Sequence, residues 1–237
     1  MKRVFQQEDS FHFWISLSLK VLSNHITCES IPNLHESASP ALTKPVMPDD
    51  YTQDQTFDKT DFTGTPLLKG EYEACIFTAC NFLSTDLSNY RFTECEFTSC
   101  NLSLTKLSGT NFQNTRFRNC KMLGLHFDTC SPFGLSFSFE DCQVNHSSFY
   151  KTGISKTVFR ATQLHETDFT DADLTGVVFD NCDLLRATFD NTVLERADLR
   201  TAFNYSIDPE RNRLKKARFS LPEVVGLLNK YDIIIER

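Results

Sequence analysis

Large apolar side chains recur at every fifth position over most of this chain. The same count holds without a miss from Phe57 to Phe127 and resumes, two residues out of phase, at Phe139. The residue two places before each large one is usually small, so each unit reads small–x–large–x–x. In the clearest stretch the large residues are Phe169, Leu174, Phe179, Leu184, Phe189, Leu194 and Leu199.

This spacing fits neither a packed helix nor a flat strand. A helix has about 3.6 residues per turn, so it would spread residues five apart around its whole circumference. A strand would send alternate large residues to opposite faces. A chain that turns a corner after every five residues points the small and the large residue inward and leaves three to solvent. The pattern therefore predicts a solenoid of short straight sides.

The kind of large residue repeats at intervals of twenty. Phe149, Phe169 and Phe189 form one such series, and Phe159 and Phe179 form a second series offset by ten. Four sides of five residues would make one coil, with phenylalanine columns on opposite walls and aliphatic columns between them. Successive coils would pair through backbone hydrogen bonds at a spacing of about 4.8 Å. We expect about seven coils.

The repeat resembles the pentapeptide-repeat family, whose consensus is A(D/N)Lxx. The segments "ADLTG" (Ala172–Gly176) and "ADLR" (Ala197–Arg200) match that consensus directly, and the resemblance extends over about residues 56–219. It implies an all-β fold, a right-handed quadrilateral β-helix.

Three regions follow from the extent of the repeat. Residues 1–50 lack it and are expected to form an irregular or partly helical N-terminal extension, whereas residues 51–219 form the β-helix. The β-helix has a break at residues 128–138, where Pro132 stands at a large position and two extra residues shift the register. This break is either a bulge or short loop joining two stacks, or a loop that contacts a partner.

Residues 220–237 are expected to cap the last coil. Ser220 and Glu223 have the spacing of a capping box, which predicts a short helix, and "YDIII" (Tyr231–Ile235) predicts a strand. Because this cap is itself apolar, it either simply closes the solenoid or forms a two-fold dimer interface. The candidate interface residues are Val224, Leu227, Leu228, Tyr231, Ile233 and Ile235.

The positions of the cysteines in the repeat predict that they lie in the core. Seven of the nine occupy the small inward position, Cys130 keeps the phase and Cys28 lies outside the repeat. Buried free cysteine behaves as a small apolar residue, and so many thiols favour a reducing, cytoplasmic compartment. The apolar stretch Phe11–Leu22 is too short to span a bilayer, so no membrane association is expected.

The sequence shows no catalytic, phosphate-binding or dinucleotide motif, so we expect no enzyme and no cofactor. The alternative is a metal-dependent or acid–base pair formed by His146 and His165 across neighbouring coils, near Asp168. Histidines on the outer surface are the simpler interpretation.

The charge distribution suggests a candidate binding surface. The net charge of −7 disfavours binding to nucleic acid or anionic membrane. Residues 161–199 carry nine acidic residues against two arginines. This surface is either the solvated exterior of the coils or an imitation of DNA. Counting by five places its acids on all four sides and not in one stripe, which weakens the case for an imitation of DNA. The candidate partner-binding residues are Asp168, Asp171, Asp173, Asp180, Asp183, Asp190, Glu195 and Asp198.

The order of repeats, "IDPERN" (Ile207–Asn212), helix and apolar strand resembles the Qnr-type quinolone-resistance proteins. That resemblance implies a homodimer joined through the C-terminal cap that mimics DNA, binds DNA gyrase or topoisomerase IV and protects them from quinolones. Some Qnr proteins carry sizeable projecting loops, whereas this chain has only the two-residue slip. The alternative is a general protein-interaction scaffold with no topoisomerase role.

Overall fold

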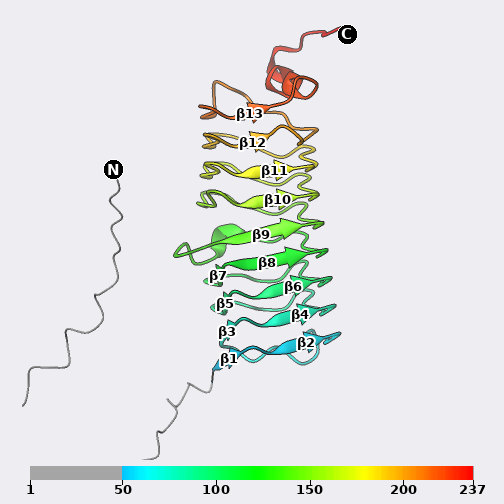
Figure 1. Ribbon diagram of the computed structural model, residues 1–237, viewed down its shortest axis with the longest axis vertical. Coiled ribbons are helices and arrows are strands. Elements are labelled where there is room, and N and C mark those ends of the chain that lie inside the picture. The colour runs from blue at the N-terminus through cyan, green and yellow to red at the C-terminus, as the bar shows by residue number, and fades with distance from the viewer. Residues whose placement is uncertain (1–49, 237) are drawn as a thin grey trace, which may run out of the picture. The chain divides into compact units, whose positions relative to one another are not determined.

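The computed structural model describes residues 50–236, which form a β-solenoid (Figure 1). The expected N-terminal extension and Cys28 lie outside the described residues. The fold is all-β with almost no helix, as the repeat predicts, and the chain makes about eight turns where about seven were expected. The right-handed winding stays an expectation of the family resemblance.

One wall of the solenoid, which we call wall 1, is a nine-stranded parallel sheet. Neighbouring strands pair residues twenty apart, as at Phe159 and Phe179. The exception is the step from Phe117 to Phe139, where the two-residue slip falls. This register confirms the coil of twenty residues. In spatial order the strands are β2 (Thr56–Asp58), β4 (Ile76–Thr78), β6 (Glu96–Thr98), β8 (Thr115–Arg118), β9 (Phe137–Glu140), β10 (Val158–Arg160), β11 (Val178–Asp180), β12 (Asp198–Leu199) and β13 (Arg218–Phe219).

Walls 2 and 3 are held by ladders of single bridges between coils. The ladder of wall 2 starts at Asp61 and continues through Asn81 to Phe203, and that of wall 3 includes Ser148 and Asp168. Because each bridge again joins successive coils, the chain turns four corners per coil.

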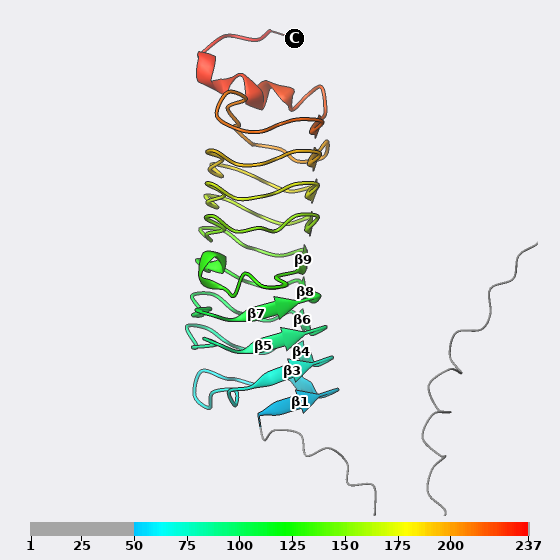
Figure 2. The same cartoon turned by 90° about the vertical axis from the view of Figure 1, so that its left-hand side faces the viewer.

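Wall 4 begins as a four-stranded parallel sheet, which faces the viewer in Figure 2. Beyond the break it continues as a ladder through Gly153, Asp173, Val193 and Arg213. The strands are β1 (Tyr51–Gln53), β3 (Glu71–Glu73), β5 (Arg91–Thr93) and β7 (Asn111–Gln113).

The corners are made by residues in the left-handed backbone conformation. Two positions after most of the large residues the backbone φ is positive, for example 54° at Asn191, 49° at Asn119 and 69° at Gly176. Glycine, asparagine and aspartate adopt this conformation at low cost, whereas other residues are strained by their Cβ atom. The corner position therefore explains why the repeat has a period of five.

Leu104 is expected to be a strained corner. Its φ is 59° and 59% of it is exposed, so Leu104→Asn should raise the free energy of unfolding by roughly 0.5–1 kcal/mol. Leu83, on the same wall and 42% exposed, has no positive φ and serves as the control, because Leu83→Asn relieves no strain. Urea unfolding of both variants measures the difference, and an equal effect would contradict the role assigned to the corner.

The bore of the solenoid is solid. Rings on the same wall stack, as Phe139 and Phe159 do with centroids 4.9 Å apart and planes 2° apart. Rings on adjoining columns meet edge to face, as Phe149 and Phe159 do at 6.0 Å and 87°. Both arrangements are the favourable geometries for aromatic pairs. The columns expected from the twenty-residue spacing are therefore present, and their rings between the two end coils are buried.

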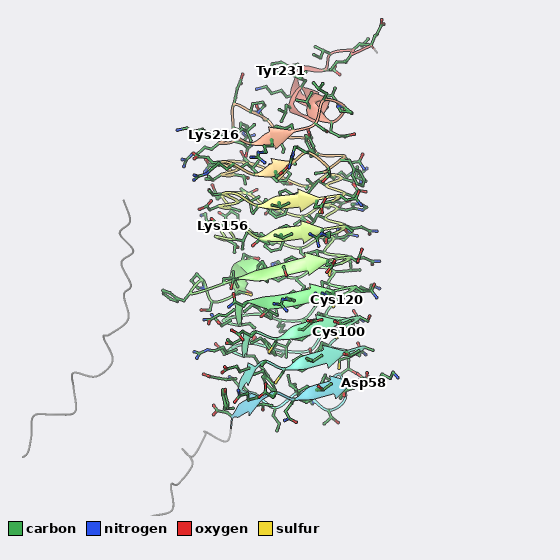
Figure 3. The ribbon with its side chains drawn as sticks, viewed as in Figure 1. Asp58, Cys100, Cys120, Lys156, Lys216 and Tyr231 are labelled. Carbon is green, nitrogen blue, oxygen red and sulfur yellow. The ribbon has the colours of Figure 1, made fainter. Side chains whose placement is uncertain are left out.

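The eight cysteines of the described region are all free and buried, as their inward positions predict. The Cys182 thiol donates a hydrogen bond to the Phe159 carbonyl oxygen at 3.3 Å, and burial raises the pKa of Cys182 to about 12. Its thiol therefore stays protonated at neutral pH and packs as a small side chain. Cys100 and Cys120 (Figure 3) belong to a column that also contains Cys80 and Cys142.

The break is a short ordered loop between η1, a 3-10 helix (Phe127–Thr129), and β9. The Ser131 and Ser136 amides donate to the carbonyl oxygens of Thr110 and Phe112, both at 2.8 Å. We call residues 131–136 the slip loop. The slip loop lies beside β7, where the next strand of the sheet would otherwise pair. The four-stranded sheet therefore ends at β7.

The cap differs from the prediction. The expected helix is divided into two 3-10 helices, η2 (Val224–Leu227) and η3 (Asn229–Tyr231), and no side-chain hydrogen bond caps the start of η2. The expected strand over Tyr231–Ile235 is wrong. Asp232 has a left-handed backbone (φ 48°) and ends η3, and the isoleucines after it pair with no strand in the described region.

Candidate binding surfaces

The eight candidate acidic residues are divided among all four walls. Asp180 and Asp198 lie on wall 1 and Asp183 on wall 2. The count of five places Asp168, Asp171 and Asp190 on wall 3 or its corner, and Asp173 and Glu195 on wall 4. The structure therefore does not collect them into a single stripe.

Half of these acids form ion pairs with arginines. Asp180 is 3.2 Å from Arg160, and Asp198 is 2.7 Å from Arg200. Hydrogen bonds from Arg200 lower the pKa of Asp198, against the opposing effect of its partial burial.

Two further pairs involve the basic residues beside the cap. Asp190 lies 2.6 Å from Arg211, and Glu195 lies 2.6 Å from Arg213. Half of the candidate acids are thus paired with arginines, and two of these arginines come from the next coil. A charge count along the chain misses this, whereas a comparison of residues about twenty apart would have found it.

On wall 1 these pairs extend into a ladder of alternating charge. Arg118 contacts Glu96 at 3.2 Å and Glu140 at 3.3 Å. Arg160 then contacts Glu140 at 3.6 Å before reaching Asp180. Exposed pairs of this kind contribute only about 0–1 kcal/mol each. Their main consequence is that wall 1 presents compensated charge to a partner.

Wall 3 keeps more of its acidity. Among the described residues, neither Asp168 nor Asp171 forms an ion pair with a basic side chain. Asp168 accepts a hydrogen bond from the Thr170 amide at 2.9 Å, and Asp171 accepts one from Asn191. Both carboxylates are therefore held in place by hydrogen bonds from uncharged groups.

The histidines do not form a joint site. His146 Nδ1 lies 3.3 Å from a Glu166 carboxylate oxygen, whereas His165 Nε2 lies 2.8 Å from Asp183. Burial alone would raise the pKa of Asp183, but hydrogen bonds from Asn204 and His165 lower it. Within residues 50–236 no group of three or more metal-ligating side chains could hold an ion. The two histidines do lie on neighbouring coils, where the His146 amide donates to the His165 carbonyl oxygen at 2.8 Å, but each imidazole pairs with a different carboxylate.

Ion pairs and a backbone hydrogen bond attach the cap to the last coils. Lys230 Nζ lies 2.7 Å from Asp208 and 2.6 Å from Glu210, and hydrogen bonds from Lys230 lower the pKa of both carboxyl groups. The Ile207 amide donates to the Gly226 carbonyl oxygen at 3.0 Å. These contacts fix η2 and η3 over the end of the bore.

The outer side of the cap is apolar. Of the candidate interface residues, Tyr231, Ile233 and Ile235 are about half exposed, while Leu227 packs against the core. Leu221 and Ile234, each 90% exposed, add to this surface and were not among the candidates from the sequence. Leu221, Pro222, Leu228, Ile233 and Ile235 border a groove of about 880 Å³.

Comparison with known proteins agrees with the repeat geometry. A family model described as "Pentapeptide repeat region" matches residues 71–137, and one described as "Pentapeptide repeats (8 copies)" matches residues 167–202. The chain is a pentapeptide-repeat protein. The comparison of this pentapeptide-repeat protein with curated sequences gave no match.

Solved structures share the fold of this pentapeptide-repeat protein. A trypsin-treated variant of QnrB1, a plasmid-mediated fluoroquinolone resistance protein, matches with a TM-score of 0.63 and 16% identity, covering 79% of this chain and 92% of that one. HetL, a pentapeptide-repeat protein involved in heterocyst differentiation regulation from Nostoc sp. strain PCC 7120, matches with a TM-score of 0.54 and 15% identity, covering 72% and 86%. At such identities the likeness is one of fold.

No helix within residues 50–236 has the length and apolar character needed to cross a bilayer.

Proposed function

We propose that this protein is a non-catalytic DNA mimic that binds a type II topoisomerase, DNA gyrase or topoisomerase IV, and protects it from quinolones. The observation that carries the proposal is a stiff rod with an acidic wall 3. Eight steps of about 4.8 Å make the rod about 38 Å long, comparable to about eleven base pairs at about 3.4 Å per pair. The likeness in fold to QnrB1, a fluoroquinolone resistance protein, supports this choice of partner.

Binding through wall 3 requires no chemistry and no cofactor. The bore is filled by buried phenylalanine and aliphatic side chains, so the outer walls are the surfaces available to a partner. The negative charge of wall 3 disfavours direct binding to nucleic acid and suits a basic groove built for a duplex. We further propose a cytoplasmic homodimer joined through the apolar cap, which would place two acidic rods end to end; the reduced thiols fit that compartment.

A gyrase supercoiling assay with ciprofloxacin tests the proposal. The protein is expected to restore supercoiling that the drug inhibits, since it would compete with DNA for the cleavage site. The double variant Asp168→Asn with Asp171→Asn should weaken this rescue several-fold. Asp180→Asn with Asp198→Asn is the matched control on wall 1, where arginines already compensate the charge. Neither rescue nor inhibition of supercoiling by the unaltered protein would refute the proposal.

A general interaction scaffold is the second candidate. The pairing of half of the candidate acids with arginines favours it, because compensated walls suit a partner other than a DNA-binding groove. The same assay separates the two candidates: a scaffold leaves supercoiling unchanged with or without the drug.

A further inference from the structure

Wall 4 carries opposite charges on its two halves. The coils before the break carry four acids and one base, a net charge of 1 − 4 = −3, and those after the break carry five bases and two acids, a net charge of 5 − 2 = +3. Lys156 and Lys216 lie along the edge of this wall (Figure 3). The first group is Asp54, Glu71, Glu73, Glu94 and Arg91, and the second is Lys156, Arg196, Arg213, Lys215, Lys216, Asp173 and Glu195.

The slip loop lies between the two halves and exposes an aromatic ring. Phe133 is 81% exposed, unlike every other phenylalanine among residues 50–236. The loop is not loosely attached, since Asn111 Nδ2 donates to the Phe133 carbonyl oxygen at 2.7 Å and the Ser131 and Ser136 amides bond to the coil below. An ordered loop that exposes a large ring suits contact with another surface.

We infer that wall 4 is a self-association face on which a second copy packs antiparallel, with a two-fold axis through the slip loop. A second copy is the one partner guaranteed to carry the complementary charges, because its acidic half meets the basic half of the first. A two-fold contact is also the commonest symmetry of soluble assemblies. The two Phe133 rings would meet at the axis.

The register of the coils makes the expected contacts specific. Wall 4 has nine levels, of which the slip loop is the fifth. Turning one rod about an axis that runs across the wall at that loop brings the first level opposite the ninth and the third opposite the seventh. Asp54 then faces Lys216. Arg91, which pairs with Glu71 of its own chain at 3.0 Å, faces Asp173. Glu73 and Glu195 also face each other, but each already has a partner of its own: Glu73 accepts a hydrogen bond from Tyr51 at 2.6 Å, and Glu195 pairs with Arg213.

Such a contact would be weak and sensitive to salt. The wall is narrow and its charges are exposed, so the buried area lies at the low end for specific interfaces and the pairs are screened within about 10 Å at 0.1 M salt. The aromatic pair at the centre would carry most of the affinity. This inference concerns wall 4 alone and is independent of the proposed binding through wall 3 and the cap.

Charge exchange between two variants tests the inference. Both are made in the full chain with Leu221→Asp and Ile234→Asp, which place charges on the cap surface and remove its contribution to association. One variant carries Asp54→Lys with Glu94→Lys, and the other carries Lys156→Glu with Lys216→Glu. All four positions are exposed corners, so the exchanges leave the core unchanged.

Sedimentation velocity should find the cap-altered parent as a dimer in about 20 mM salt and a monomer in about 500 mM salt. Each charge-reversed variant alone should be a monomer, and an equal mixture should dimerise again because opposite halves then match. Restoration on mixing also shows that both variants are folded. Phe133→Ser in the parent should weaken association roughly tenfold. A monomeric parent at low salt, or a mixture that stays monomeric, would overturn the inference.

Discussion

Replacing Phe159 by alanine is expected to lower the free energy of unfolding by about 3–5 kcal/mol. The ring is fully buried and stacks between Phe139 at 4.9 Å and Phe179 at 5.3 Å. It also meets Phe149 and Phe169 edge to face. The surrounding coils cannot close the resulting cavity, since hydrogen bonds of β10 to β9 and β11 fix their spacing. The loss should therefore include both the transfer free energy of the ring and the cavity.

Urea unfolding followed by circular dichroism measures this loss. Phe133→Ala is the matched control, because the same substitution on an exposed ring should change stability by less than about 0.5 kcal/mol. Phe159→Leu should fall between the two, since leucine refills part of the space. If Phe159→Ala cost less than about 1 kcal/mol, the bore could not be the packed interior described above.

The parts of the fold that repeat could be predicted from sequence. The inward positions of Phe159 and Cys182 follow from local spacing alone, because each residue is placed by its own five-residue unit. The coil of twenty followed from the columns that phenylalanine forms. The slip at residues 128–138 was visible as a change of phase, and it is where the four-stranded sheet ends.

Features that depend on a specific neighbour were harder to predict. The pairing of Asp190 with Arg211 joins residues on different coils, and a local charge count treats them as separate clusters. The exposure of Phe133 depends on how the slip loop is anchored by Asn111, which no periodicity encodes.

The cap shows the same limitation. Its apolar residues were recognised, but the run Tyr231–Ile235 has strand propensity and no strand beside it. Strand propensity depends on packing against neighbours, so without such an edge the segment stays irregular. The repeat therefore predicts the positions of core residues, whereas the shape of the cap depends on neighbours that the repeat does not encode.

Gly226→Val is expected to release the cap from the rod. Gly226 is buried, and an added Cβ would lie 2.3 Å from the Tyr205 carbonyl oxygen and 2.7 Å from its ring. The Tyr205 carbonyl oxygen belongs to the backbone, so it cannot move aside as a flexible side chain would. The hydrogen bond from the Ile207 amide to the Gly226 carbonyl oxygen would also break. Overpacking of this kind costs about 1–3 kcal/mol or more, which the short 3-10 helices of the cap are poorly able to offset.

Limited proteolysis should then cleave within residues 220–236 at least tenfold faster while the coils stay intact, because cleavage follows the population of the opened cap. Gly64→Val is the control, since an added Cβ there meets nothing within 4 Å. If the cap also joins two copies, the same substitution should shift sedimentation toward the monomer, and the control should not. Unchanged cleavage in Gly226→Val would mean that the contacts of Gly226 with Tyr205 and Ile207 do not hold the cap in place.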